Sequence, residues 1–185
     1  MEAATDRPRA NALSAFLAGL EGGMLGALWM LAFMGLYAEW RLTSFWTPEN
    51  LMATAFHRHA AIRDGFGAGT VSGLALYLAV YSLLGALFAL AVGGRLPRAR
   101  VFLTAVAFAL CWYYLSFQWL WKSLLPLVSL LHVEQSTILG HVIYGAVLGQ
   151  FPVRMMRGVA PPAATVAAPE PVAAEPAPPE THPEP

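Results

Sequence analysis

The sequence predicts an all-α integral membrane protein, a four-helix transmembrane bundle with short interfacial helices in the outer loops and a disordered C-terminal tail. Two observations carry this prediction. Of the 185 residues, 57% are apolar and only 12% are charged, about half the charged share of a soluble domain. Four apolar stretches are long enough to cross a bilayer, and two of them show almost no polar face at helical spacing, which disfavours a soluble helical bundle.

The apolar stretches are predicted to be helices because every backbone N–H and C=O group in lipid must be paired within its own segment. A helix needs about 20 mainly apolar residues to cross the hydrocarbon core. The first stretch is longer than the apolar region of a signal peptide, and no clear cleavage site follows it, so we expect an uncleaved anchor. The four predicted spans cover about residues 12–38, 70–92, 101–121 and 137–155, the last being the shortest and least apolar.

A formal net charge of zero hides two unlike parts. Residues 161–185 hold nine of the 14 prolines and four glutamates, but no Lys or Arg. Proline at this density blocks helices and sheet ladders, so we expect a disordered Pro/Ala/Glu-rich tail over 158–185. The rest of the chain is basic and divides into an N-terminal segment, 1–11, and a transmembrane domain, 12–157.

The placement of basic residues predicts the orientation in the membrane. Cytoplasmic loops carry an excess of Lys and Arg, and one side of the predicted bundle has seven such residues against four on the other. We therefore expect a multi-pass protein of the bacterial inner membrane with both termini in the cytoplasm. The seven are Arg7, Arg9, Arg95, Arg98, Arg100, Arg154 and Arg157, and the four are Arg41, Arg58, Arg63 and Lys122.

The first outer loop is predicted to contain a short interfacial helix over residues 47–60. Thr47 is the expected N-cap and Pro48 fits the first helical position, where its missing N–H costs nothing. We expect Leu51, Met52 and Phe56 to lie against the membrane and Glu49, Asn50 and Arg58 to face water.

The second outer loop is apolar for a connection, which predicts a second interfacial or re-entrant segment over residues 124–131. Pro126 should interrupt any continuation of the third span. Glu134 and Gln135 are expected in water, and Ser136 is the expected cap of the fourth span.

Glycines four residues apart predict close helix packing, because they let helix backbones approach in the absence of a hydrophobic drive. Packing within the chain is the plain interpretation, and homodimerisation through one of these faces is the alternative. The candidate packing residues are Gly19 and Gly23 in the first span, Gly69 and Gly73 at the second, and Gly145 and Gly149 in the fourth.

Polar residues inside the predicted spans are the candidates for chemistry, because such residues are costly in lipid. They are Glu21, Tyr77, Tyr81, Gln118 and His141. A structural role for Glu21, paired with a basic residue or hydrated at the cytoplasmic side, competes with a role in proton or ion handling. His141 is expected to form a hydrogen bond with a neighbouring helix.

Neither a metal site nor a cofactor is predicted. A haem held by two histidines requires them on facing spans at matching depth, and only His141 falls within a span. His57 and His59 diverge on a helix, and with His132 they are expected to be solvated. The chain also lacks HExxH, GxSxG, Walker and GxGxxG motifs, so we expect no enzyme. Its charge balance does not predict nucleic-acid binding.

A pattern of glycine, aromatic and histidine residues resembles a family of small four-span bacterial inner-membrane proteins of unknown function. It begins with Gly19 to Gly35 and continues with Phe45-Trp46-x-Pro48-x-x-Leu51 and a Gly-rich second span. It ends with Gly140-His141-x-x-Tyr144-Gly145-x-x-Leu148-Gly149. The resemblance covers about residues 12–152; it implies a four-helix membrane fold and a bacterial source, and no activity.

Two functional hypotheses follow from these observations. The first is a structural or interaction subunit that packs through Gly-rich helix faces, with the lipid bilayer, a second copy or another membrane protein as partner. The second is a small oligomeric transporter or channel for protons or small solutes, lined by the polar candidates. Binding of haem, quinone or lipid is a further alternative.

Overall fold

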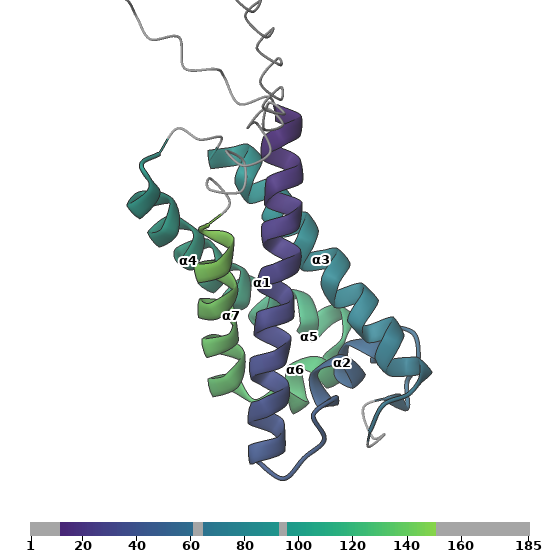
Figure 1. Cartoon of the computed structure of the whole chain (residues 1–185). Coiled ribbons are helices and arrows are strands. Elements are labelled where there is room, and N and C mark those ends of the chain that lie inside the picture. The colour runs from purple at the N-terminus through teal and green to yellow at the C-terminus, as the bar shows by residue number, and fades with distance from the viewer. Residues whose placement is uncertain (1–11, 61–64, 93–95, 151–185) are drawn as a thin grey trace, which may run out of the picture.

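The computed structural model describes residues 12–60, 65–92 and 96–150, and this part of the chain is helical without a strand. Four longer helices run alternately up and down, and the short helices gather at one end of the molecule (Figure 1). The elements are α1 (Ala12–Trp40), α2 (Thr47–Met52), η1 (Ala53–Ala55), α3 (Ala68–Val92), α4 (Arg98–Leu115), the π-helix η3 (Ser116–Leu120), α5 (Trp121–Leu124), α6 (Pro126–Leu131) and α7 (Glu134–Leu148).

Three helical stretches are long and apolar enough to cross a membrane: α1, α3, and the continuous helical run from Arg98 to Leu124. The predicted spans over 12–38, 70–92 and 101–121 are therefore confirmed as apolar helices of spanning length. The expectation of four clear spans is not met. Helix α7 has 15 residues and is about 22 Å long, against a hydrocarbon core of about 30 Å. Residues 151–155, the end of the predicted fourth span, lie outside the described residues.

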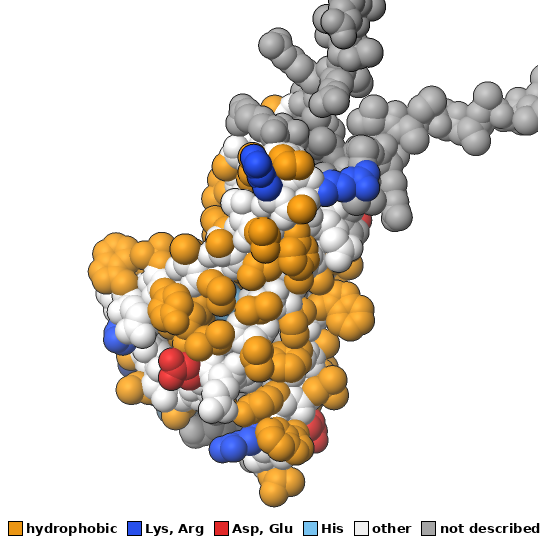
Figure 2. Space-filling model, turned by 90° about the vertical axis from the view of Figure 1, so that its left-hand side faces the viewer, with side chains coloured by type: hydrophobic (Ala, Val, Ile, Leu, Met, Phe, Trp, Pro, Cys, Tyr) orange, Lys and Arg blue, Asp and Glu red, His pale blue; other side chains and the backbone are white. Residues whose placement is uncertain are grey.

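The surface carries many apolar side chains, as a surface in contact with lipid requires. Figure 2 shows hydrophobic side chains over most of the visible face, with Lys and Arg near its upper end and in its lower part. On α1 alone Leu13, Leu17, Trp29 and Leu36 are each more than half exposed. A soluble protein rarely exposes so large an apolar surface, so the surface agrees with the membrane assignment.

Helix α1 packs against α3 through glycines. A Cβ atom on Gly19 would lie 2.5 Å from the carbonyl oxygen of Gly85, and one on Gly85 would lie 2.7 Å from Cα of Gly23. Real Cβ atoms do not approach backbone this closely, so the crossing needs glycine on both helices.

Helix α7 lies between α1 and α4 (Figure 1). A Cβ on Gly145 would lie 2.6 Å from Cα of Val106, and one on Gly149 would lie 2.9 Å from Cα of Phe102. These glycines therefore set the distance between α7 and α4. Gly69, in contrast, has only ordinary contacts around its Cβ direction.

Helix α2, within the first outer loop, is buried in the protein, which corrects the prediction of an interfacial helix with a face in water. Glu49 and Asn50, expected in water, are 2% and 3% exposed, and Leu51 and Met52 belong to the core. The reason is Gly73 of α3, whose missing side chain lets the carbonyl of Glu49 approach its Cα. Phe56 is exposed, as expected.

The predicted helix caps are displaced. Helix α2 begins at Thr47 with Trp46 as the capping position, and the Thr47 hydroxyl donates to the carbonyl of Ser44. Helix α7 begins at Glu134, two residues before Ser136, whose hydroxyl donates to the carbonyl of Val133. In both cases the hydroxyl bonds to a carbonyl three residues back instead of a free N–H, a local alternative available to Ser and Thr.

Candidate functional site

The centre of the bundle holds a buried pair, Tyr81 of α3 and His141 of α7. Their Oη and Nε2 atoms are 2.8 Å apart, and Nδ1 of His141 lies 2.7 Å from the carbonyl oxygen of Thr137. Because a carbonyl only accepts, Nδ1 carries the proton, and in the neutral ring Nε2 accepts from Tyr81. The neutral form fits a side chain with no exposed surface, since a buried unpaired charge is costly.

Two further tyrosines extend the buried pair. The ring of Tyr77 stacks on that of Tyr81 with 4.6 Å between centroids and 12° between planes. The Tyr77 hydroxyl donates to the sulfur atoms of Met30 and Met34, each at 3.9 Å. On the other side, the Tyr144 hydroxyl donates to the backbone carbonyl of Tyr81 at 2.8 Å. The three tyrosines therefore fix the position of α3 relative to α1 and α7.

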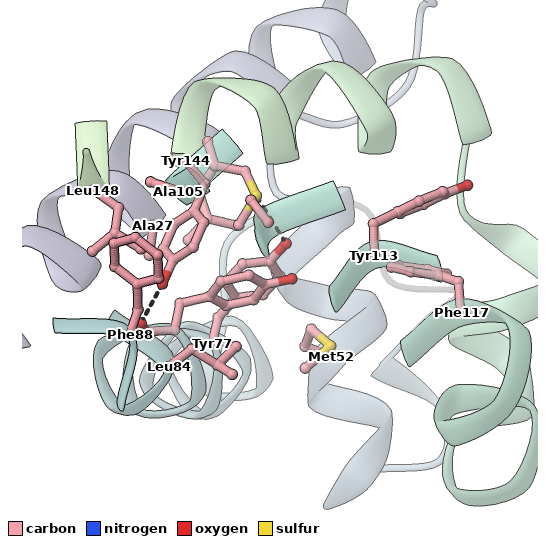
Figure 3. Packing of buried hydrophobic residues seen from close by; sticks show 14 of the residues in the cluster. Ala27, Met52, Tyr77, Leu84, Phe88, Ala105, Tyr113, Phe117, Tyr144 and Leu148 are labelled. Carbon is pink, nitrogen blue, oxygen red and sulfur yellow. Dashed lines mark hydrogen bonds between the residues drawn. The ribbon is translucent and has the colours of Figure 1, made fainter. Parts of the chain in front are cut away.

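Aromatic rings from α4 and η3 surround His141. The centroids of Tyr113 and Phe117 are 5.3 Å and 6.3 Å from that of His141. Phe117 lies in the π-helix, a form that occurs often at functional sites. Figure 3 shows Tyr77, Met52 and Phe117, from three different elements, approaching one central region.

A cavity of about 250 Å³ occupies this region. Tyr77 and Tyr81 lie at its buried inner end, and Arg41 and Thr43, both exposed, lie at its mouth. Its walls are mainly apolar or aromatic. The wall residues include Met34, Leu51, Met52, Phe117, Trp121, Val128 and Leu131, and the polar ones include Tyr37, Thr47, His132, Ser136 and Thr137.

A buried carboxyl group lies beside the cavity. Glu49 is on the turn of α2 that packs against Gly73. Its carboxyl group interacts electrostatically with Tyr77. Its Oε2 has no hydrogen-bond partner; Nε1 of Trp112 is the other such buried atom in the described part of the chain. Burial raises the pKa of Glu49 to about 7, and the hydrogen bond from its own backbone N–H opposes that rise. Both the neutral and the ionised form of Glu49 are therefore populated near pH 7.

The structure brings together three of the five predicted polar candidates: Tyr77, Tyr81 and His141. Glu21 is exposed on α1, and its expected partners, Arg95 and Arg154, lie outside the described residues. Gln118 is exposed and accepts a hydrogen bond from Lys122 at 2.9 Å. Neither belongs to the buried cluster.

Sequence reasoning missed Glu49 and the cavity. The spacing of Tyr77, Tyr81 and Gly73 on one stripe of α3 was a usable signal, because a stripe that faces the bundle also faces whatever packs there. Nothing in the sequence around Glu49 distinguishes a solvated first-turn carboxylate from a buried one. The difference arises from the contact with α3.

The other histidines are dispersed. His57 and His59 are exposed, and His132 is half-buried at the cavity, with Nδ1 2.8 Å from the carbonyl oxygen of Ser129. Among the described residues, no group of three or more His, Cys, Asp or Glu side chains is placed to hold a metal ion.

Comparison of the chain with protein-family models, with curated proteins and with solved structures gives no match. The functional argument therefore depends on the geometry of the chain's own residues.

Proposed function

We propose that this chain is a membrane protein that binds a small lipophilic molecule in the cavity between α1, α2, α3, α6 and α7. The observation that carries the proposal is the cavity itself, with apolar walls and a pair of stacked tyrosines at its closed end. Small-molecule sites are typically concave and apolar, with a few placed polar groups. The proposed role is binding, and no catalytic step is part of it.

The proposed setting is the bacterial inner membrane, with both termini in the cytoplasm and α7 as a short fourth span. Support comes from the antiparallel run of the four longer helices, which places the start of α1 at the same end as the end of α3 (Figure 1). Arg98 and Arg100 begin α4 at this end, whereas Arg41 and Lys122 lie toward the other. In this orientation the cavity opens on the outer side of the membrane.

Photolabelling tests the proposal. We would add a neutral alkyl diazirine to the protein in lipid nanodiscs, irradiate the sample and map the label by mass spectrometry. We expect saturable labelling of Met52 and Phe117, which are 3% and 7% exposed and so are shielded from lipid. Labelling confined to exposed residues such as Leu130, rising linearly with reagent, would contradict the proposal.

Two neighbouring leucines of α6 provide a matched pair of variants. Leu131 lines the cavity and is half exposed, and Leu130 is 77% exposed and does not line it. Leu131→Trp should obstruct the cavity and reduce labelling of Met52, while Leu130→Trp should leave it unchanged. Equal labelling in both variants would show that the label reaches Met52 by another route and would count against the cavity.

A further inference from the structure

We infer that the cavity selects a neutral lipophile that presents a carbonyl oxygen to Tyr77, with a flat head group of the quinone type. This inference rests on the proposed binding function and specifies its ligand. It follows from the hydrogen bonds already made around the cavity, from the absence of Lys and Arg at its inner end, and from its aromatic walls.

Seven hydroxyl groups line the cavity in the described part of the chain, and six already donate to strong acceptors. Tyr81 donates to a ring nitrogen and Tyr37 to a side-chain amide oxygen. The other four donate to backbone carbonyls. These four are Thr43 to Ala38, Thr47 to Ser44, and Ser136 and Thr137 to Val133.

Tyr77 is the exception. Its hydroxyl lies 3.9 Å from the thioether sulfurs of Met30 and Met34, which are weak acceptors, and it also interacts with the hydroxyl of Tyr81. Stacking on Tyr81 fixes the ring, so the O–H donor is positioned before a ligand arrives. A ligand carbonyl oxygen is a stronger acceptor than a thioether, so it can take the Tyr77 proton in exchange for these weak contacts.

The charges around the inner end favour a neutral head group. Neither Lys nor Arg lines the cavity there, since the cavity's one arginine, Arg41, is at the mouth. An anionic head at Tyr77 would also lie near the carboxyl group of Glu49, and the ionised form of that group would repel it. A carbonyl oxygen accepts a hydrogen bond without carrying a full charge, so it meets both conditions.

The aromatic walls of the cavity and the arginine at its mouth favour a ligand with a flat ring and a second hydrogen-bond acceptor. Tyr77 and Tyr81 present stacked rings at the inner end, and Phe117 and Trp121 add aromatic wall. Aromatic walls favour a flat partner. An oxygen on the opposite edge of such a ring would face the mouth, where the guanidinium of Arg41 offers donors. A para-quinone has this arrangement, with two carbonyl oxygens across an apolar ring.

Equilibrium binding of tritiated decylubiquinone to the protein in nanodiscs tests the inference, with empty nanodiscs as the background. We expect saturable one-to-one binding. Tyr77→Phe keeps the ring and removes the donor, and should weaken binding about three- to tenfold, the usual range for one hydrogen bond. Tyr114→Phe also removes a tyrosine hydroxyl, but at an exposed position that does not line the cavity, and should leave binding unchanged.

Competing ligands of matched tail length separate the head-group classes. Decylbenzene, decanoate and decyltrimethylammonium should each displace decylubiquinone at least tenfold less well than the unlabelled quinone. Equal competition by decylbenzene, together with no effect of Tyr77→Phe, would overturn the carbonyl assignment and leave the binding function standing. If decyltrimethylammonium competed better than the unlabelled quinone, the aromatic walls would be a binding site for a cation, and the inference would be wrong. Absence of quinone binding while the diazirine still labels Met52 would also overturn the inference, whereas failure of both experiments would remove the binding function.

Discussion

Tyr81 of α3 donates its hydroxyl proton to Nε2 of His141 on α7, with 2.8 Å between the two atoms. Both helices pack mainly against other partners, α3 against α1 and α7 against α1 and α4. The bond therefore joins two helices across the centre of the bundle. It also fixes the tautomer of His141, because Nδ1 is committed to the carbonyl of Thr137.

Replacing His141 should destabilise the fold. His141→Ala leaves the Tyr81 hydroxyl buried without its acceptor, which costs about 1–3 kcal/mol of unfolding free energy, and the vacated space adds to the loss. Thermal unfolding in a mild detergent, followed by near-ultraviolet circular dichroism, measures the effect. His59→Ala, at an exposed position, is the control and should unfold like the parent. Identical midpoints for both variants would show that the Tyr81–His141 bond contributes nothing to stability.

A single methyl group at Gly85 should separate α1 from α3. The new Cβ of Gly85→Ala would meet Cα of Gly23 at 2.7 Å, and overpacking against backbone costs about 1–3 kcal/mol. The higher helix propensity of alanine, about 1 kcal/mol, offsets part of this. Unfolding in detergent reports the net loss.

Gly67 provides the comparison for Gly85, because no atom lies within 4 Å of its Cβ direction. Gly67→Ala should therefore change stability little. A Gly85→Ala protein as stable as Gly67→Ala would mean that the α1–α3 crossing has room to relax.

Stability should fall as the pH rises through the neutral range. Burial raises the pKa of Glu49 from an ordinary 4.5 to about 7, so the folded state holds the proton more tightly than the unfolded state. The stabilising contribution is complete below about pH 4.5, declines between these values and is lost above about pH 7. Its full size is on the order of 3 kcal/mol, at about 1.4 kcal/mol for each pKa unit.

Glu49→Gln removes the titrating group and should flatten this dependence. Unfolding midpoints measured from pH 5 to pH 8 should fall with rising pH in the parent and change little in Glu49→Gln. Glu134→Gln, at an exposed position, should behave like the parent. A parent protein whose stability is constant over this range would contradict the burial of Glu49.

Much of the helical framework was predictable because apolar length is a property of each segment alone. The boundaries of α1, α3 and the run from Arg98 to Leu124 follow from such stretches and from Pro126, at which a new helix begins. The burial of α2 was not predictable, because it depends on a contact with Gly73 far along the chain. A glycine in a sequence permits a close approach, without showing whether anything approaches or what it is.

The candidate site was predictable only in part, for a related reason. Tyr77, Tyr81 and His141 were identifiable as polar residues in apolar segments. Glu49 sits in a loop with the composition of an exposed turn, and its environment is tertiary. The role of the glycine rows as an interface for a second copy or another membrane protein stays a prediction; within the chain, Gly19, Gly23, Gly145 and Gly149 contact other helices.

The apolar walls of the cavity have a consequence for water. An ordered water molecule needs two to four polar partners, and the side chains of Met34, Leu51 and Met52 offer no strong one. Water is therefore poorly held near Met34, Leu51 and Met52. An entering molecule has little tightly bound solvent to displace from this part of the wall, so the apolar surface that it buries there should add to its affinity.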